Sequence, residues 1–153
     1  MQSTWTKEEL AYFAGILDGE GCFCLHSHTA KPSFRGHIYA CAIHVGNTDI
    51  RLLQWIADRF GGRVFAEQRQ NAKWKDVWRW YARTDDMDVW LPAVLPYLII
   101  KRDQAELLMA YRKTLPPKAR THRSTGATTD AVKQQRAQIH ANLAMLNKRG
   151  AAS

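Results

Sequence analysis

The stretch Phe13–Gly21 constrains this chain most, because it combines two glycines four residues apart with an acidic end. Residues i and i+4 of a helix share a face, so Gly15 and Gly19 form a strip without side chains that another backbone can approach closely. Gly21 is typical of a residue that ends a helix. Glu20 therefore lies at the end of a close-packed helix, where its carboxylate is a candidate metal ligand.

Composition restricts the class of protein. The 153 residues suffice for one domain with its own core, and a hydrophobic share of 46% is typical of a soluble globular protein. A net charge of +8 indicates nucleic acid or an anionic membrane as partner. No apolar run approaches the roughly 18 residues of a transmembrane helix. With no secretory signal and three cysteines, an odd number, we expect an intracellular protein in a reducing compartment, without membrane contact.

Hydrophobic periodicity predicts the order helix, two strands, helix, two strands, helix, and then further helices. The helices are expected over 6–19, 50–60, 85–95, 103–113 and 131–147, and the strands over 22–28, 37–45, 63–69 and 74–83. Two hairpins interleaved with helices predict an α+β fold with an αββαββα core. Its four-stranded antiparallel sheet carries helices on one face and leaves the other as an open saddle. We expect residues 1–115 to form this core, and the basic loop and helix of 116–153 to belong to the same domain.

On these residues the chain resembles the LAGLIDADG homing endonucleases. Phe13–Gly21 is similar to the nine-residue motif of that family, with Glu20 as the terminal acid, and the element order over about residues 5–114 is that of the family core. Pro96–Lys101 is similar to the segment that carries the family's catalytic-site lysine. Only one copy of the motif is present in this sequence. The resemblance implies that such a chain acts as a homodimer.

The resemblance also implies a reaction. It is a double-strand break with short 3′ overhangs in a long pseudo-palindromic DNA site, made by Mg²⁺-dependent phosphodiester hydrolysis. Glu20 and the backbone carbonyl of Gly19 are the expected ligands, and Mn²⁺ or Ca²⁺ can occupy the same sites. Lys101 is expected to steady the attacking water or the phosphate charge. Asn47 and Arg51 match positions near the solvent network of the catalytic centre.

One carboxylate per chain is too few for a metal cluster, which makes assembly part of the prediction. Two chains that meet along Gly15, Ile16 and Gly19 would bring both copies of Glu20 side by side, one for each DNA strand. The symmetry of such a dimer predicts the pseudo-palindromic target. Asp18 is also acidic, but the resemblance implies that its role is mainly structural.

Alternation along the strands predicts which side chains face the DNA. Cys22, Cys24, His26 and His28 share one face of the strand over 22–28. Alternate residues lie about 6.6 Å apart along a strand, so four ligands in a line cannot surround one tetrahedral ion, and we expect no zinc site from this row. Gln and Arg are suited to reading bases. The expected DNA-binding residues are Cys24, His26, His28, Ile38, His44, Gln68, Gln70, Arg79, Tyr81 and Arg83.

Two other functions stay open on the sequence. An intron maturase on the same fold would bind intron RNA through the same basic surface. A DNA-binding regulator that has lost catalysis is the third candidate, although the intact Glu20 and Lys101 weigh against it. From Arg112 to Arg149 there are nine Lys or Arg residues against one acid, Asp130, and the segment 118–128 within this stretch is predicted to be a loop suited to nucleic acid.

Overall fold

The computed structural model describes residues 5–28, 38–68, 70–115 and 129–151. The predicted α+β fold and its order of elements are confirmed, whereas the predicted loop at 118–128 lies outside the described residues. The elements are α1 (Lys7–Glu20), β1 (Gly21–His28), β2 (Ile38–Asn47), α2 (Ile50–Phe60), β3 (Arg63–Glu67), β4 (Val77–Tyr81), α3 (Thr84–Val94), the 3-10 helix η1 (Leu95–Tyr97), α4 (Arg102–Lys113) and α5 (Asp130–Ala151).

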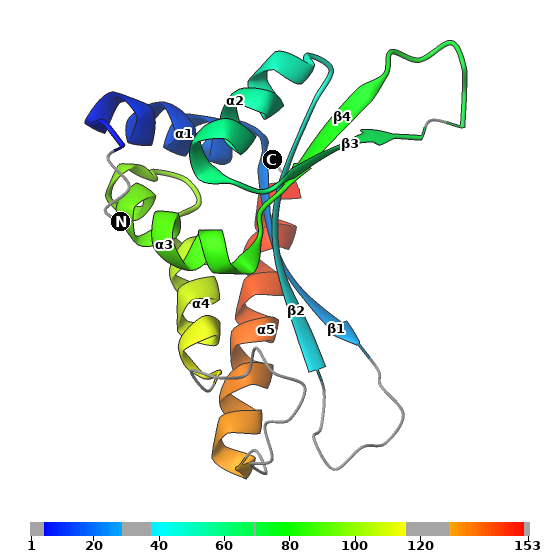
Figure 1. Ribbon diagram of the computed structural model, residues 1–153. Helices are drawn as coiled ribbons and strands as arrows, with labels where there is room; N and C mark the ends of the chain where they lie inside the picture. Colours follow the sequence, from blue (N-terminus) through cyan, green and yellow to red (C-terminus); the bar gives the residue numbers. More distant parts are fainter. Residues whose placement is uncertain (1–4, 29–37, 69, 116–128, 152–153) are drawn as a thin grey trace.

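The four strands form one antiparallel sheet in the order β1-β2-β4-β3. Figure 1 shows the helices gathered on one side of this twisted sheet, with the other side open. The side chains that point toward the helices are buried, among them Phe23, Ile43 and Trp80. Their neighbours along the strands, such as His44 and Tyr81, lie on the open face. The alternation predicted from the sequence is therefore confirmed for β1, β2 and β4.

Helix α1 begins and ends as its sequence predicts. Thr6 and Glu9 form a reciprocal capping box, in which the Thr6 hydroxyl accepts from the Glu9 amide at 3.1 Å and the Glu9 carboxylate accepts from the Thr6 amide at 3.0 Å. At the other end Gly21 has an extended backbone, and a Cβ at this position would lie 2.6 Å from the Leu17 carbonyl oxygen. Glycine is required there by the close approach, which lets the chain pass from α1 directly into β1.

Strands β3 and β4 are shorter than predicted. The chain turns at Asn71, whose side chain accepts from the Lys73 amide at 3.0 Å and whose carbonyl accepts from the Trp74 amide at 3.1 Å. These local bonds replace ladder bonds, so β3 ends at Glu67 and β4 begins at Val77. The strands predicted over 63–69 and 74–83 are therefore too long at the turn, and β4 also ends at Tyr81 rather than at residue 83. Helix α3 runs past Pro92 and ends at Val94, and none of the helices in the described ranges is long and apolar enough to cross a membrane.

The core joins all the layers through aromatic side chains. The ring of Phe13 lies 4.1 Å from that of Phe60, 4.9 Å from that of Trp90 and 5.7 Å from that of Trp80, measured between centroids. Ile139 and Leu143 of α5 are buried in the same cluster. Aromatic pairs at these separations add to the free energy of burial. This cluster holds α1 against the sheet and so determines where the end of α1 lies.

We expect Gly62→Ala to destabilise the fold, because Gly62 has φ +94° and a Cβ there would lie 2.4 Å from Trp80 Nε1. The free energy of unfolding should fall by about 1–3 kcal/mol in urea titrations. Gly46→Ala is the matched control, because its nearest neighbour is the Trp78 carbonyl oxygen at an ordinary 3.8 Å. Equal losses in the two variants would contradict this account of the turn.

Candidate functional site

The carboxylate of Asp18 ties the end of α1 to the segment that precedes α4. Its two oxygens accept three backbone N–H bonds, from Ile99 at 2.9 Å, Ile100 at 3.1 Å and Lys101 at 3.0 Å. A carboxylate that accepts several amide bonds is strongly held in one orientation. Asp18 is thus fully used in positioning two segments that lie more than eighty residues apart in the sequence.

Lys101 reaches the junction of α1 and β1. Its backbone is fixed by Asp18, and its ammonium donates to the backbone carbonyl of Gly21, the residue after Glu20. The Lys101 side chain is half-buried, so its charge is held beside the acidic end of α1. The structure thus places the Lys101 ammonium at the residue that follows Glu20, and the catalytic role of both residues stays a prediction.

Glu20, in contrast to Asp18, is exposed and available. Within the described ranges of the chain, no residue forms a hydrogen bond or an ion pair with its carboxylate. The backbone of Gly19 beside it is exposed as well, and a Cβ added at Gly15 or Gly19 would meet no atom within 4 Å. The end of α1 therefore presents a free carboxylate next to an open strip of backbone.

Ile16 does not belong to this strip. Its side chain is only 8% exposed and packs in the core with Phe13 and Leu17, so it offers almost no area to a second chain. The prediction that places Ile16 in the dimer interface is wrong for a simple geometric reason. Consecutive residues of a helix point in directions about 100° apart, and Ile16 follows the buried stripe rather than the glycine strip.

Asn47 and Arg51 serve the start of α2. The side chain of Asn47 accepts from the Asp49 amide at 2.8 Å, and Asp49 caps the helix by accepting from the Arg51 amide at 3.0 Å. Asp49 also forms an ion pair with the Arg51 guanidinium at 2.7 Å. Hydrogen bonds from Arg51 lower the pKa of Asp49 to about 2. Among the described contacts, none joins these residues to Glu20 or Lys101, and their catalytic role stays a prediction.

The open face of the sheet carries one row across all four strands. The register places Cys22, His44, Tyr81 and Arg63 opposite one another in turn. The His44 and Tyr81 rings lie 5.3 Å apart. The row mixes aromatic and cationic groups, which suits stacking and phosphate contacts.

Arg79 lies next to this row and is held from two sides. It donates to Nδ1 of His44 at 3.1 Å and to the Glu67 carboxylate at 2.8 Å. The pKa of Arg79 is raised, chiefly by the hydrogen bond to Glu67. Sequence reasoning missed Glu67, because its proximity depends on the pairing of β3 with β4. That pairing places Glu67 two positions along β3 from Phe65, which lies opposite Arg79.

The other predicted DNA-binding residues divide by location. His26 is exposed and Cys24 half-buried on the open face of β1. Gln68 and Gln70 lie beyond the end of β3, and Arg83 precedes α3, 3.9 Å from Asp86, so these three lie outside the strands that carry the row. Their role in DNA binding stays a prediction. The backbones of His28 and Ile38 pair across the hairpin, while their side chains lie outside the described part of the structure.

Two thiols on β1 lie unusually close together. The sulfur atoms of Cys22 and Cys24 are 3.1 Å apart, and Nε2 of His44 lies 4.0 Å from the Cys24 sulfur. Hydrogen bonds with Cys24 and then with His44 lower the pKa of Cys22 to about 4. The hydrogen bond with Cys22, together with burial, raises the pKa of Cys24. The sequence shows the two cysteines, but only the strand register shows that His44 joins them.

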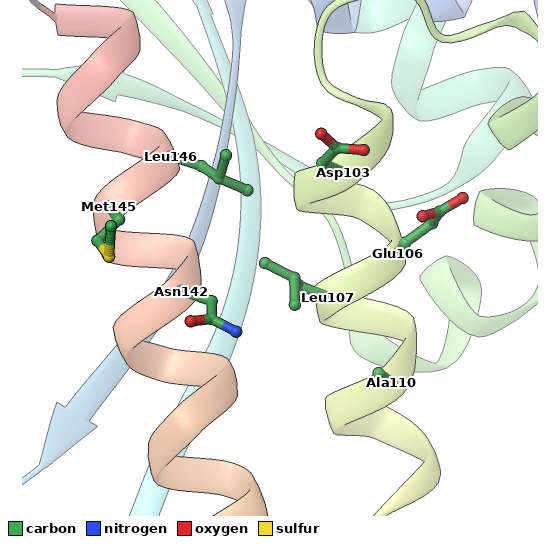
Figure 2. A pocket seen from close by; sticks show the side chains of 7 residues that line it. All are labelled: Asp103, Glu106, Leu107, Ala110, Asn142, Met145 and Leu146. Carbon is green, nitrogen blue, oxygen red and sulfur yellow. The ribbon is translucent and has the colours of Figure 1, made fainter.

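A groove of about 510 Å³ lies elsewhere, between α4 and α5. Figure 2 shows Leu107 and Leu146 facing each other across it, with Asp103 and Glu106 at its α4 side. Both helices pack on β1 from the side opposite to the open face. The groove is therefore separate from the acidic end of α1 and from the row on the sheet.

The fold and this site define a class of protein: an α+β chain with an open, saddle-shaped sheet and an exposed carboxylate at the end of α1. No protein-family profile and no curated protein matches the chain. Solved structures do match it. The homing endonuclease I-CvuI, in complex with its target, has 21% identity and a TM-score of 0.71, with 91% of this chain and 82% of that chain covered.

Two further structures share the fold. The archaeal intron-encoded homing endonuclease I-Vdi141I, complexed with DNA, has 13% identity and a TM-score of 0.73, with 91% of this chain and 84% of that chain covered. The LAGLIDADG homing endonuclease I-GzeII, in complex with its DNA target, has 19% identity and a TM-score of 0.67, with 88% and 44% covered. The chain has the LAGLIDADG homing endonuclease fold, and the resemblance seen in the sequence is confirmed at the level of the fold.

We expect Asp18→Asn to loosen the site. An amide offers one acceptor oxygen, and its NH₂ group would face a backbone N–H, so the free energy of unfolding should fall by about 1–3 kcal/mol. Amide hydrogen exchange at residues 99–101 should accelerate. Asp58→Asn, at an exposed position on α2, is the control and should change stability by no more than about 0.5 kcal/mol. Unchanged exchange at residues 99–101 would contradict the positioning role of Asp18.

Proposed function

We propose that this chain is a sequence-specific DNA endonuclease that acts as a homodimer and hydrolyses phosphodiester bonds with a divalent metal ion. The observation that carries the proposal is the contrast between two acids of α1. Asp18 is bound by three backbone amides, whereas Glu20 is exposed and precedes Gly21, whose carbonyl accepts from Lys101. A structural acid needs partners, while an acid that binds a metal must keep its oxygens free.

The donor set at the end of α1 fits Mg²⁺. The Glu20 carboxylate and the Gly19 carbonyl are oxygen donors, which hard cations prefer, and both residues are exposed. When bound, such an ion polarises the phosphate and favours ionisation of water. I-CvuI has been solved in the presence of calcium and of magnesium, and I-SmaMI in the presence of calcium ions. Lys101 would contribute a fixed positive charge near the phosphate, steadied by its bond to the Gly21 carbonyl.

The open face is the proposed DNA surface. A chain with net charge +8 attracts the phosphate backbone, and this attraction should weaken steeply with salt. The side chains that would contact bases or phosphates in a groove of the DNA are those of His26, His44, Arg79 and Tyr81. Solved neighbours with the same fold are complexes with DNA, which supports duplex DNA as the partner.

A homodimer would complete the site. The strip at Gly15 and Gly19 is open, and two apolar side chains lie beside it, Ile99 at 87% and Ile100 at 70% exposure. Both are tied to the end of α1 by the amide bonds to Asp18. Apolar side chains this exposed, next to a flat strip, are typical of an interface. The chain also spans only 44% of I-GzeII, which is consistent with a larger active unit of two such halves.

We expect Glu20→Gln to abolish cleavage and preserve binding. The substrate is a DNA duplex selected by its binding to the protein from a randomised library. With Mg²⁺ present, the rate of linear product formation should fall by at least about a hundredfold, since a transition-state contact is lost. Glu8→Gln, an exposed acid at the start of the same helix, is the matched control and should cleave like the wild type.

Other outcomes would contradict the endonuclease. A wild-type protein that binds its selected duplex but never cuts it with Mg²⁺ would favour the silent regulator. Tighter binding to structured intron RNA than to any duplex, without cleavage, would favour the maturase. Cleavage by Glu20→Gln at the wild-type rate would remove Glu20 from the reaction.

We expect the double change Ile99→Glu and Ile100→Glu to prevent dimerisation, because it places like charges on both sides of the proposed interface. The variant should sediment as a monomer at concentrations where the wild type dimerises, and should lose cleavage. Val89→Glu is the control, at a similarly apolar residue on α3 that is 58% exposed. A wild-type protein that sediments as a monomer even on its DNA would contradict the shared site.

A further inference from the structure

We propose that Cys22, Cys24 and His44 bind one Zn²⁺ ion on the open face of the sheet. One potential ligand atom from each of the three residues lies within 4.8 Å of the other two. The sulfur atoms are 3.1 Å apart, and Nε2 of His44 lies 4.0 Å from the Cys24 sulfur. This set is distinct from the hard oxygen donors at the end of α1.

The separations match what a zinc ion requires. Zinc–sulfur bonds of about 2.3 Å and zinc–nitrogen bonds of about 2.0 Å at tetrahedral angles place the ligand atoms about 3.5–3.8 Å from one another. The two thiols are slightly closer than this and the imidazole is slightly farther, so small side-chain rotations suffice. All three residues are half-buried, which leaves a fourth position for water. Three protein ligands and one open position are a known zinc arrangement.

The strand register removes the objection that applies to a single strand. Cys22 and Cys24 point the same way along β1, and His44 lies directly opposite Cys22 on β2. The third ligand therefore comes from the neighbouring strand, so the three ligands form a triangle rather than a line. His26 lies opposite Ala40, farther along the hairpin, and is not part of this set.

Ligand chemistry separates this site from a magnesium site. Thiolate and imidazole ligands favour zinc, whereas Mg²⁺ prefers carboxylate and carbonyl oxygens. Millimolar Mg²⁺ should therefore fail to displace zinc from the two cysteines, even though the end of α1 is close by in sequence. This difference provides the conditions of the test.

Arg79 competes with zinc for His44. A guanidinium can only donate, so its bond to Nδ1 of His44 requires that Nδ1 carries no proton. The neutral ring then carries its proton on Nε2, which faces Cys24. Zinc on Nε2 needs the other tautomer, so Arg79 must leave Nδ1 and keep only its bond to Glu67. Zinc binding and the contact between Arg79 and His44 therefore exclude each other.

The test is zinc titration of the full chain without DNA, in excess Mg²⁺, by calorimetry and by metal analysis after gel filtration. We expect one zinc per chain. Cys22→Ser and His44→Asn should each weaken binding by more than the roughly tenfold cost of losing a supporting contact. Cys41→Ser is the control, because Cys41 lies on the opposite face of β2 from His44 and packs against the core. Arg79→Gln, which can accept from Nδ1–H, should bind zinc more tightly.

A readout on the unmodified chain avoids dependence on variants that fold poorly. Zinc should protect Cys22 and Cys24 from iodoacetamide and leave the labelling of Cys41 unchanged, as measured by mass spectrometry. Co²⁺ in place of zinc should give a thiolate charge-transfer band. Absence of protection, zinc affinity unchanged in Cys22→Ser or His44→Asn, or binding by Arg79→Gln no tighter than by the wild type would each overturn the site. None of these measurements depends on nuclease activity.

Discussion

The three amide bonds to Asp18 are the contact on which the site depends. They join the end of α1 to residues 99–101, and so they fix the backbone of Lys101 beside Glu20. Without these bonds, the backbone of Lys101, which is 83 positions from Asp18 in the sequence, would not be held in place at the end of α1. The same bonds hold Ile99 and Ile100 next to the glycine strip of α1. The Asp18 carboxylate thus positions both Lys101 and the two exposed isoleucines of the proposed interface.

The core decides which face of the sheet is available. Trp80 is fully buried, and its indole N–H donates to the Gly61 carbonyl at 2.8 Å, which ties β4 to the end of α2. With Phe13 packed edge-on against Trp80, α1 cannot slide along the sheet. Because side chains alternate along a strand, burying Trp80 sends Arg79 and Tyr81 to the opposite face. The side chains available on the open face are thus determined by the burial of Trp80 on the other face.

Local periodicity was enough to predict the helices, the inner parts of the strands and the free acid at the end of α1. It failed where partners are distant in sequence. Nothing local shows that Glu67 reaches Arg79, or that His44 lies opposite Cys22, because both depend on strand register. Ile16 is buried although it follows Gly15 directly, because consecutive residues of a helix point about 100° apart. The strand ends at the turn could not be predicted, because the side chain and carbonyl of Asn71 accept the backbone hydrogen bonds of Lys73 and Trp74.

Charge links metal binding to assembly in the proposed dimer. Two copies of Glu20 side by side repel each other, and each also repels the phosphate that it would serve. Lys101 offsets part of this repulsion, but its ammonium is already bound to the Gly21 carbonyl. A divalent ion held by the Glu20 carboxylates would supply positive charge that offsets this repulsion. The closed arrangement of two chains on DNA should therefore form best when metal is present, so that binding energy and catalytic competence rise together.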